Sequence, residues 1–195
     1  MKQLLIEYES LEYTSSLLME AADMSKPLVL RNVLLQRANT KNQNGRVYPK
    51  DVLFREVSAY KKGFVMDRRA MGELDHPERP TVNLKNVCCN ITDIWINEDE
   101  VRGDIAILTT PAGNIVRELI KNNVRIGVSS RSMGSVKKMD ESTTEVQDDL
   151  SLICFDIVST PSVQGAYLTE AVNDGSDVVQ SRLDILIYDF LSEIK

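Results

Sequence analysis

The stretch of residues 87–108, VCCNITDIWINEDEVRGDIAIL, carries the pattern that decides the fold. Residues 87–96 and 101–108 are rich in β-branched and other apolar side chains, as strands usually are. The polar segment 97–100 that joins them has the length of a hairpin connection. We therefore expect two neighbouring antiparallel strands here.

Further strands are expected on both sides of this hairpin. Apolar runs predict strands at residues 28–35 and 150–158, and another strand that starts at Val124. The polar segment 137–149 contains five acidic residues and no apolar pattern, so we expect a solvent-exposed loop or the tip of a hairpin there.

Two helices are expected between these strands. Pro49 and Pro111 each suit the first turn of a helix, and the apolar residues after Pro111 recur at helical spacing. The first helix should reach about Lys62, and Asn122 should end the second. Strands of mixed pattern with so few helices predict an α+β domain, with an antiparallel sheet or barrel at its centre.

The two ends of the chain differ from this central part. Residues 1–27 are rich in Leu and Glu and end at Pro27, which predicts a separable, partly helical tail. Residues 171–195 carry one apolar helical stripe, formed by Leu183, Leu186, Ile187, Phe190 and Ile194. We expect a central domain at 28–170, with each end a candidate propeptide. A permanent C-terminal helix that closes the core is the alternative.

Composition excludes several classes of protein. The chain has 195 residues and a formal net charge of −6, whereas proteins that neutralise nucleic-acid phosphates concentrate Lys and Arg. No apolar run approaches the roughly 18 residues of a membrane span, so we expect a cytoplasmic protein. Cys88, Cys89 and Cys154 lack metal-ligand spacing and should be buried thiols. We expect neither a metal nor a cofactor.

The chain has one histidine, His76, in the polar segment 72–77, GELDHP. A serine hydroxyl becomes a good nucleophile when a histidine takes its proton, and an acid usually orients that histidine. Alone, a loop histidine is more often ordinary surface. A metal-dependent hydrolase is the rival enzyme class, with Glu73, Asp75, His76 and Glu78 as ligands, but a single histidine and no cysteine pair make it a poor candidate.

Serines and glycines surround the candidate nucleophiles in residues 125–134, RIGVSSRSMG. The backbone amides of Ser130 or Arg131 could form an oxyanion hole, and the Arg131 side chain could anchor substrate. A serine-rich strand end without chemistry is the alternative. Asp156 is the one charged residue in the apolar strand 152–158, so it needs a partner. Either the His76 imidazole or a Lys or Arg side chain could pair with the Asp156 carboxylate.

Four segments occur in the order found in one known family: NGRVYP at 44–49, GELDHP at 72–77, GVSSR at 127–131, and DIVSTPS at 156–162. Over roughly residues 28–170 the chain resembles the prohead proteases of T-even-type tailed phages. The resemblance implies a fold like herpesvirus assemblin, a mostly antiparallel β-barrel surrounded by helices. It places the catalytic serine and histidine at Ser129 and His76, with Asp156 as the acidic third member and Ser130 as the alternative nucleophile.

The resemblance also implies an activity and its setting. Such enzymes are serine endopeptidases that cleave scaffold or core proteins and the major capsid protein inside the immature prohead, in the host cytoplasm. They cut after Glu in a Leu/Ile-x-Glu context and process themselves, which makes Glu7, Glu20 and Glu170 candidate self-cleavage sites. No direct nucleic-acid or membrane contact is expected, and a homo-oligomer is left open.

Two questions stay open at this point. Arg125, Arg131 and Lys121 are candidates for recognising the substrate glutamate, although solvated surface charge is the more common explanation for each. The alternative function is an inactive capsid- or scaffold-binding protein that retains the protease fold, since a fold does not dictate activity.

Overall fold

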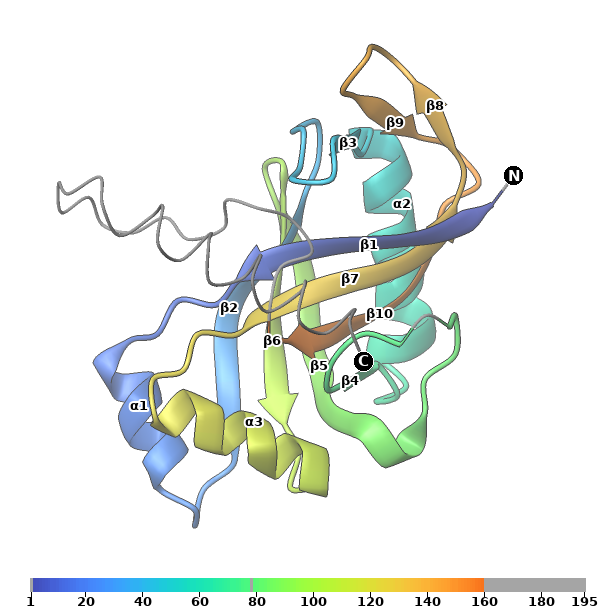
Figure 1. Ribbon diagram of the computed structural model, residues 1–195. Helices are drawn as coiled ribbons and strands as arrows, with labels where there is room; N and C mark the ends of the chain where they lie inside the picture. The colour runs from blue at the N-terminus through green and yellow to red at the C-terminus, as the bar shows by residue number, and fades with distance from the viewer. Residues whose placement is uncertain (1, 78, 160–195) are drawn as a thin grey trace, which may run out of the picture. The chain divides into compact units, whose positions relative to one another are not determined.

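The computed structural model describes residues 2–77 and 79–159, and Figure 1 shows the course of the chain. The helices and strands follow one another in this order: β1 (Gln3–Ser10), α1 (Ser15–Ala22), β2 (Leu28–Arg37), β3 (Arg46–Val47), α2 (Lys50–Tyr60), a π-helical turn (Lys61–Val65), β4 (Met71–Glu73), a 3-10 turn (Leu84–Asn86), β5 (Val87–Asn97), β6 (Glu100–Ile107), α3 (Pro111–Lys121), β7 (Gly127–Gly134), β8 (Val136–Lys138), β9 (Thr144–Val146) and β10 (Ser151–Val158).

The described strands form three sheets, with strand orders β1-β7-β10, β2-β6-β5-β4 and β3-β9-β8. Every pairing is antiparallel except that of β3 with β9. The expected α+β class with mostly antiparallel sheets is therefore confirmed. The expected barrel is not, because the ladders do not close: between the two larger sheets the described strands share one isolated bridge, Leu74 with Ile157.

The central hairpin of β5 and β6 is confirmed, with Asn97 paired to Glu100 at its tip. Along β6, Val101, Gly103, Ile105 and Ile107 are buried while their neighbours are partly exposed, as expected for a strand with one face on the core. A side chain at Gly103 would not fit, since its Cβ would lie 2.6 Å from the Asp93 carbonyl oxygen.

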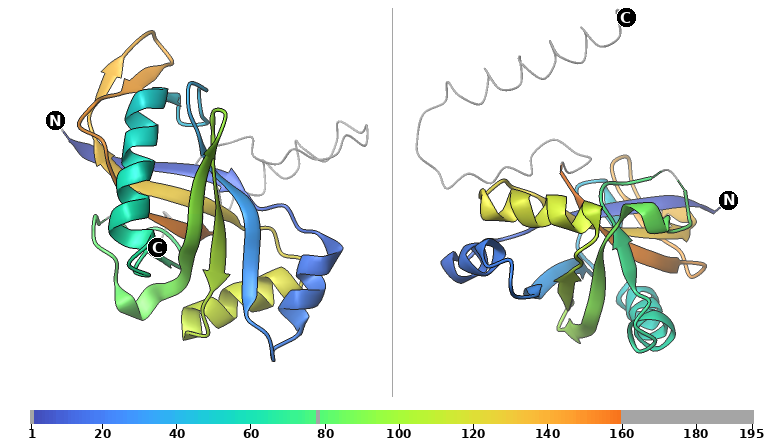
Figure 2. Two further views of the ribbon diagram at one scale, coloured as in Figure 1. Left: turned by 180° about the vertical axis from the view of Figure 1, so that it is seen from behind. Right: turned by 90° about the horizontal axis from the view of Figure 1, so that it is seen from below.

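Both expected helices are confirmed. Pro111 occupies the first turn of α3, and the Thr110 side chain accepts a hydrogen bond from the Gly113 amide at 3.1 Å as its N-cap. Figure 2 shows α3 beside α1, while α2 packs along the far side of the strands. The segment 137–149 is a hairpin tip, as expected, because β8 and β9 pair across it. Among the described residues, no helix has both the length and the apolarity to cross a membrane.

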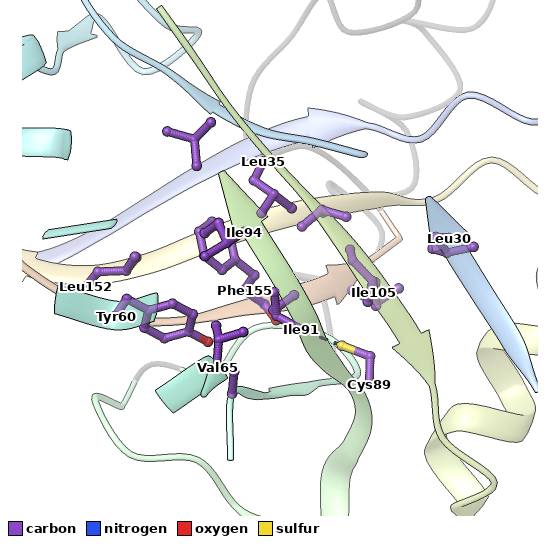
Figure 3. Packing of buried hydrophobic residues seen from close by; sticks show 14 of the residues in the cluster. Leu30, Leu35, Tyr60, Val65, Cys89, Ile91, Ile94, Ile105, Leu152 and Phe155 are labelled. Carbon is purple, nitrogen blue, oxygen red and sulfur yellow. Dashed lines mark hydrogen bonds between the residues drawn. The ribbon is translucent and has the colours of Figure 1, made fainter. Parts of the chain in front are cut away.

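The core lies between the two larger sheets, and α2 closes one side of it (Figure 3). Tyr60 from the end of α2 packs edge-on against Phe155 of β10, with ring centroids 5.6 Å apart. Ile91, Ile94 and Ile105 from the central hairpin are fully buried beside them. This packing fixes β10 relative to the hairpin, and β10 carries one member of the candidate site.

The first 27 residues are helical in part, as expected, and they also contain a strand that the sequence did not predict. Residues Ser15–Ala22 are helical, but Gln3–Ser10 form a strand whose Leu5 is fully buried. Tertiary pairing with β7 overrides the local preference of a Leu- and Glu-rich segment. Whether residues 1–27 are ever removed stays a prediction. The expected C-terminal helix at 171–195, and the candidate cleavage site Glu170, lie outside the described residues.

Candidate active site

Backbone contacts between β4 and β10 place His76 in the candidate site. The Asp75 amide donates to the Ile157 carbonyl at 2.7 Å, and Asp75 has a left-handed backbone with φ of 66° that turns the chain. Gly72 allows this approach, since a Cβ there would lie 1.9 Å from the Phe155 carbonyl oxygen. The loop with His76 is thus held against the strand that carries Asp156.

His76 and Asp156 lie together, as one of the two sequence alternatives required. His76 Nδ1 is 3.3 Å from Asp156 Oδ2, and the Asp156 carboxylate is fully buried. The Glu73 amide donates to Asp156 Oδ1 at 2.9 Å and fixes the carboxylate. An acid in this position holds one imidazole tautomer and leaves Nε2 to act as a base. That Nε2 is buried and has no hydrogen-bond partner among the described residues.

The other alternative, an ion pair with a basic residue, holds at the same time. Arg131 is fully buried, with Nε 3.0 Å from Asp156 Oδ2 and Nη2 2.9 Å from Glu73 Oε1. Its Nη1 donates to the Arg79 carbonyl at 2.8 Å. Glu73 is also fully buried, and its Oε2 accepts a hydrogen bond from Arg79 Nη2 at 2.5 Å. The Arg131 guanidinium therefore binds two carboxylates of the protein, whereas the sequence suggested either a substrate anchor or solvated surface charge.

Cys154 completes this cluster. Its Sγ accepts from Arg131 Nε at 3.2 Å and donates to Asp156 Oδ1 at 3.4 Å. Burial, and then the neighbouring Asp156 carboxylate, raise the pKa of the Cys154 thiol, so it stays neutral at ordinary pH. Cys88 and Cys89 are also free and buried.

No metal centre accompanies these groups within residues 2–77 and 79–159, where no three His, Cys, Asp or Glu side chains cluster suitably. One ligand of the rival metal site, Glu78, lies outside this part of the chain.

The register of β7 separates the two candidate serines. Ser129 is opposite Asp156 across the ladder, and Ser130 is opposite Phe155. Because paired residues of an antiparallel ladder share a face, Ser129 lies on the face of Asp156 and Arg131, and Ser130 lies on the other face. This register favours Ser129 over Ser130 as the nucleophile.

The Ser129 hydroxyl has a different partner from the one that catalysis needs. Ser129 is fully buried, and its Oγ donates to the Glu7 carbonyl oxygen at 2.6 Å. No hydrogen bond joins it to His76 among the described residues. Catalytic hydrogen bonds are often long or misaligned before substrate binds, so this geometry does not exclude Ser129.

Glu7 itself occupies a site that sequence reasoning missed. Its carboxylate is buried and accepts from Tyr48 Oη at 2.7 Å, Arg46 Nη1 at 2.9 Å and Asn44 Nδ2 at 2.7 Å. The three donors come from the segment 44–49, which carried the resemblance but no assigned role. The basic residues considered for glutamate recognition are elsewhere: Arg125 is exposed, and Lys121 pairs with Glu118.

Comparisons with known proteins identify relatives of this chain. The model of the family described as prohead core protein serine protease matches residues 15–177. The prohead core protein protease of Enterobacteria phage T4 is 30% identical over 149 residues, which are 74% of this chain and 69% of the relative. A solved structure of the bacteriophage T4 capsid assembly protease superposes with a TM-score of 0.69 at 24% identity, over 82% of this chain and 99% of that one, and shows that the fold is shared.

Proposed function

The chain belongs to the prohead core protein serine protease family, and from this membership we propose that it is a serine endopeptidase of phage capsid assembly, with Ser129, His76 and Asp156 as its catalytic residues. The observation that carries the proposal is the contact between His76 Nδ1 and the buried Asp156 carboxylate, on the face of the sheet to which Ser129 belongs.

The residues have distinct tasks in the reaction. His76 Nε2 accepts the Ser129 proton while Oγ attacks the carbonyl carbon of the scissile bond. The C–N bond then breaks, and His76 gives the proton to the departing amine. Water, activated by the same imidazole, hydrolyses the acyl ester and restores the hydroxyl. Asp156 orients and stabilises the imidazolium, and Arg131 with Glu73 acts as a positioning group for Asp156.

The substrates follow from the family. We propose that the enzyme cuts scaffold or core proteins and the major capsid protein inside the immature prohead, after Glu in Leu/Ile-x-Glu segments, and that it cuts itself. Among the candidate self-cleavage sites, Glu20 is exposed but lies in helix α1, which would have to unwind. Glu7 is already in an extended strand, the form in which proteases bind their substrates.

The test combines labelling with cleavage. The purified chain should react with a serine-directed fluorophosphonate at Ser129 and should cut a peptide that contains Leu-Ile-Glu-Tyr, as read by mass. Ser129→Ala and His76→Ala should each abolish cleavage, because members of a catalytic unit fail together. Ser130→Ala is the matched control and should stay active. Full activity in Ser129→Ala, with loss in Ser130→Ala, would reverse the assignment.

Loss of the Ser129 hydroxyl should not unfold the protein. It removes one hydrogen bond to a neutral carbonyl, which is worth about 1 kcal/mol. Thermal unfolding of each variant therefore separates lost chemistry from lost structure.

One observation favours the alternative, an inactive scaffold- or capsid-binding protein. Ser129 is buried and bonded to Glu7 rather than to His76. Such a protein would neither label at Ser129 nor cut any Leu-x-Glu peptide, and it would still bind the scaffold.

A further inference from the structure

Strand β1 lies in the position that a bound substrate would take. It runs antiparallel along β7, with Glu7 opposite Ser130 and Tyr8 opposite Ser129, and β10 occupies the other edge of β7 (Figure 1). Addition of an extended peptide to a sheet edge is a common way of binding peptides, with backbone hydrogen bonds for affinity and alternate side chains for specificity.

One carbonyl of β1 lies at the candidate nucleophile. Ser129 Oγ is 2.6 Å from the carbonyl oxygen of Glu7, so the peptide bond beside it is Glu7–Tyr8. A reacting bond must be held within about 3–3.5 Å of its nucleophile. Among the described residues of β7, the Ser132 hydroxyl also donates to β1, but at 3.5 Å and to the Leu5 carbonyl.

The Glu7 side chain is held by a complete set of donors. Its carboxylate has a charged donor, Arg46, and two neutral donors, Tyr48 and Asn44, all within 3 Å. Burial, and then the Glu7 charge, raise the pKa of Tyr48, which keeps the phenol protonated as a donor. A glutamine side chain would point its own N–H donors at these donors and would not form the ion pair with Arg46. This site therefore selects glutamate.

A second side chain of β1 is buried two residues earlier. Leu5 is fully buried, and a Cβ added to Gly134 would be 3.3 Å from its Cδ1. Ile6 points to the opposite face, as alternation in a strand requires. The two pockets along β7 therefore accept an apolar side chain and a glutamate separated by one residue.

The donors of the glutamate pocket come from a turn that also has contacts of its own outside β1. The Asn42 side-chain oxygen accepts from the amides of Asn44 and Arg46 at 3.0 and 2.9 Å, and Gly45 takes a left-handed φ of 72°. Because Gly45 lies against Ser142, where a Cβ would meet the carbonyl oxygen at 2.5 Å, the turn is packed on the β8–β9 hairpin. The pocket can thus persist after β1 leaves.

We propose that Asn44, Arg46 and Tyr48 form the pocket that recognises the substrate glutamate, and that β1 occupies it as a docked substrate strand with Glu7–Tyr8 as its scissile bond. This rests on the proposed function. Hydrolysis of that bond converts the Glu7 carbonyl to a carboxylate and frees the Tyr8 amine, with one water consumed. Departure of the residues up to Glu7 opens the edge of β7 for other substrates.

The decisive experiment compares two peptides that differ only in the residue before the cut, Leu-Ile-Glu-Tyr and Leu-Ile-Gln-Tyr, on the full chain. A charged hydrogen bond is worth about 1.5–3 kcal/mol, so the wild type should prefer Glu by roughly 10- to 100-fold in kcat/KM. Arg46→Gln should bring this ratio close to one, and Tyr48→Phe should lower it less. Arg37→Gln should leave it unchanged, because Arg37 contacts Glu9 of the same strand outside the pocket.

Two outcomes separate failure of this inference from failure of the function. A wild type that cuts neither peptide overturns both. If the wild type cuts after Glu and Arg46→Gln has the same ratio of kcat/KM for the two peptides, the proposed pocket is wrong and the proposed peptidase function still stands. If Arg46→Gln does not fold, the double variant Glu7→Gln/Arg46→Gln, which removes both charges of the pair, replaces it in the same comparison.

Intact mass tests the docked strand. The incubated wild type should lose the residues up to Glu7, and Glu7→Gln should keep them. An enzyme that cuts the Leu-Ile-Glu-Tyr peptide but leaves its own Glu7–Tyr8 bond intact would make β1 a permanent strand and overturn that half of the proposal.

Discussion

Replacement of Arg131 by methionine should destabilise the protein through the two carboxylates left behind. The side chain is fully buried and contacts Asp156 at 3.0 Å and Glu73 at 2.9 Å. Removal of one partner from a buried ion pair typically costs about 3–5 kcal/mol, because the remaining charge is left uncompensated. Glu73 keeps Arg79 and Asp156 keeps His76, so the lower end, about 3 kcal/mol, is expected. The total free energy of unfolding of a domain of this kind is about 5–15 kcal/mol.

Urea unfolding measures this loss directly. The free energy of unfolding falls by about 2 kcal/mol per molar urea, so a loss of about 3 kcal/mol in stability lowers the urea midpoint by roughly 1.5 M. Arg117→Met is the matched control. Arg117 is also buried, but its hydrogen-bond partners among the described residues are neutral, mainly the Lys26 carbonyl at 2.6 Å, so about 1 kcal/mol of stability should be lost. Equal midpoints for the two variants would refute the idea that uncompensated carboxylates cause the loss.

Three further predictions concern catalysis and processing. Asp156→Asn should reduce the cleavage rate less than Ser129→Ala, because the nucleophile remains while a neutral amide stabilises the imidazolium poorly; peptide kinetics measure both. The rate should fall as the pH is lowered, because a protonated His76 cannot accept the serine proton, and a rate that does not fall on acidification would argue against a histidine base. Residues 171–195 should be released by a cut after Glu170; intact mass should show this in the wild type, and an equal loss in Glu170→Gln would exclude that site.

Elements that depend on local pattern could be predicted from the sequence. The hairpin of β5 and β6 follows from two apolar runs and a polar connection, and α3 follows from Pro111 and the apolar spacing after it. Strand β1 could not be predicted in this way. Its pairing partner, β7, begins more than a hundred residues later, and a short segment rich in Leu and Glu suits a helix until that partner is present.

The site residues, too, could be predicted where they depend on local pattern and not where they depend on strand register. His76 and Asp156 could be predicted because each is the one residue of its kind in its segment, and their contact was one of two stated alternatives. The sequence could not show that Arg131 pairs with Asp156 at the same time, since this depends on the register of β10 against β7. The sequence suggested Glu73 only as a metal ligand, because its burial depends on the pairing of β4 with β5.

The buried cysteines give this protein a built-in reporter of motion. Cys154 lies at the centre of the charge cluster, and its thiol is closed to solvent and neutral, so alkylating reagents reach it only when the sheet around it opens. Cys88 and Cys89 are equally enclosed on the central hairpin. The rate of thiol modification therefore measures how often the cluster is exposed to solvent. A ligand that stabilises the pairing of the strands lowers this rate without contacting any sulfur atom.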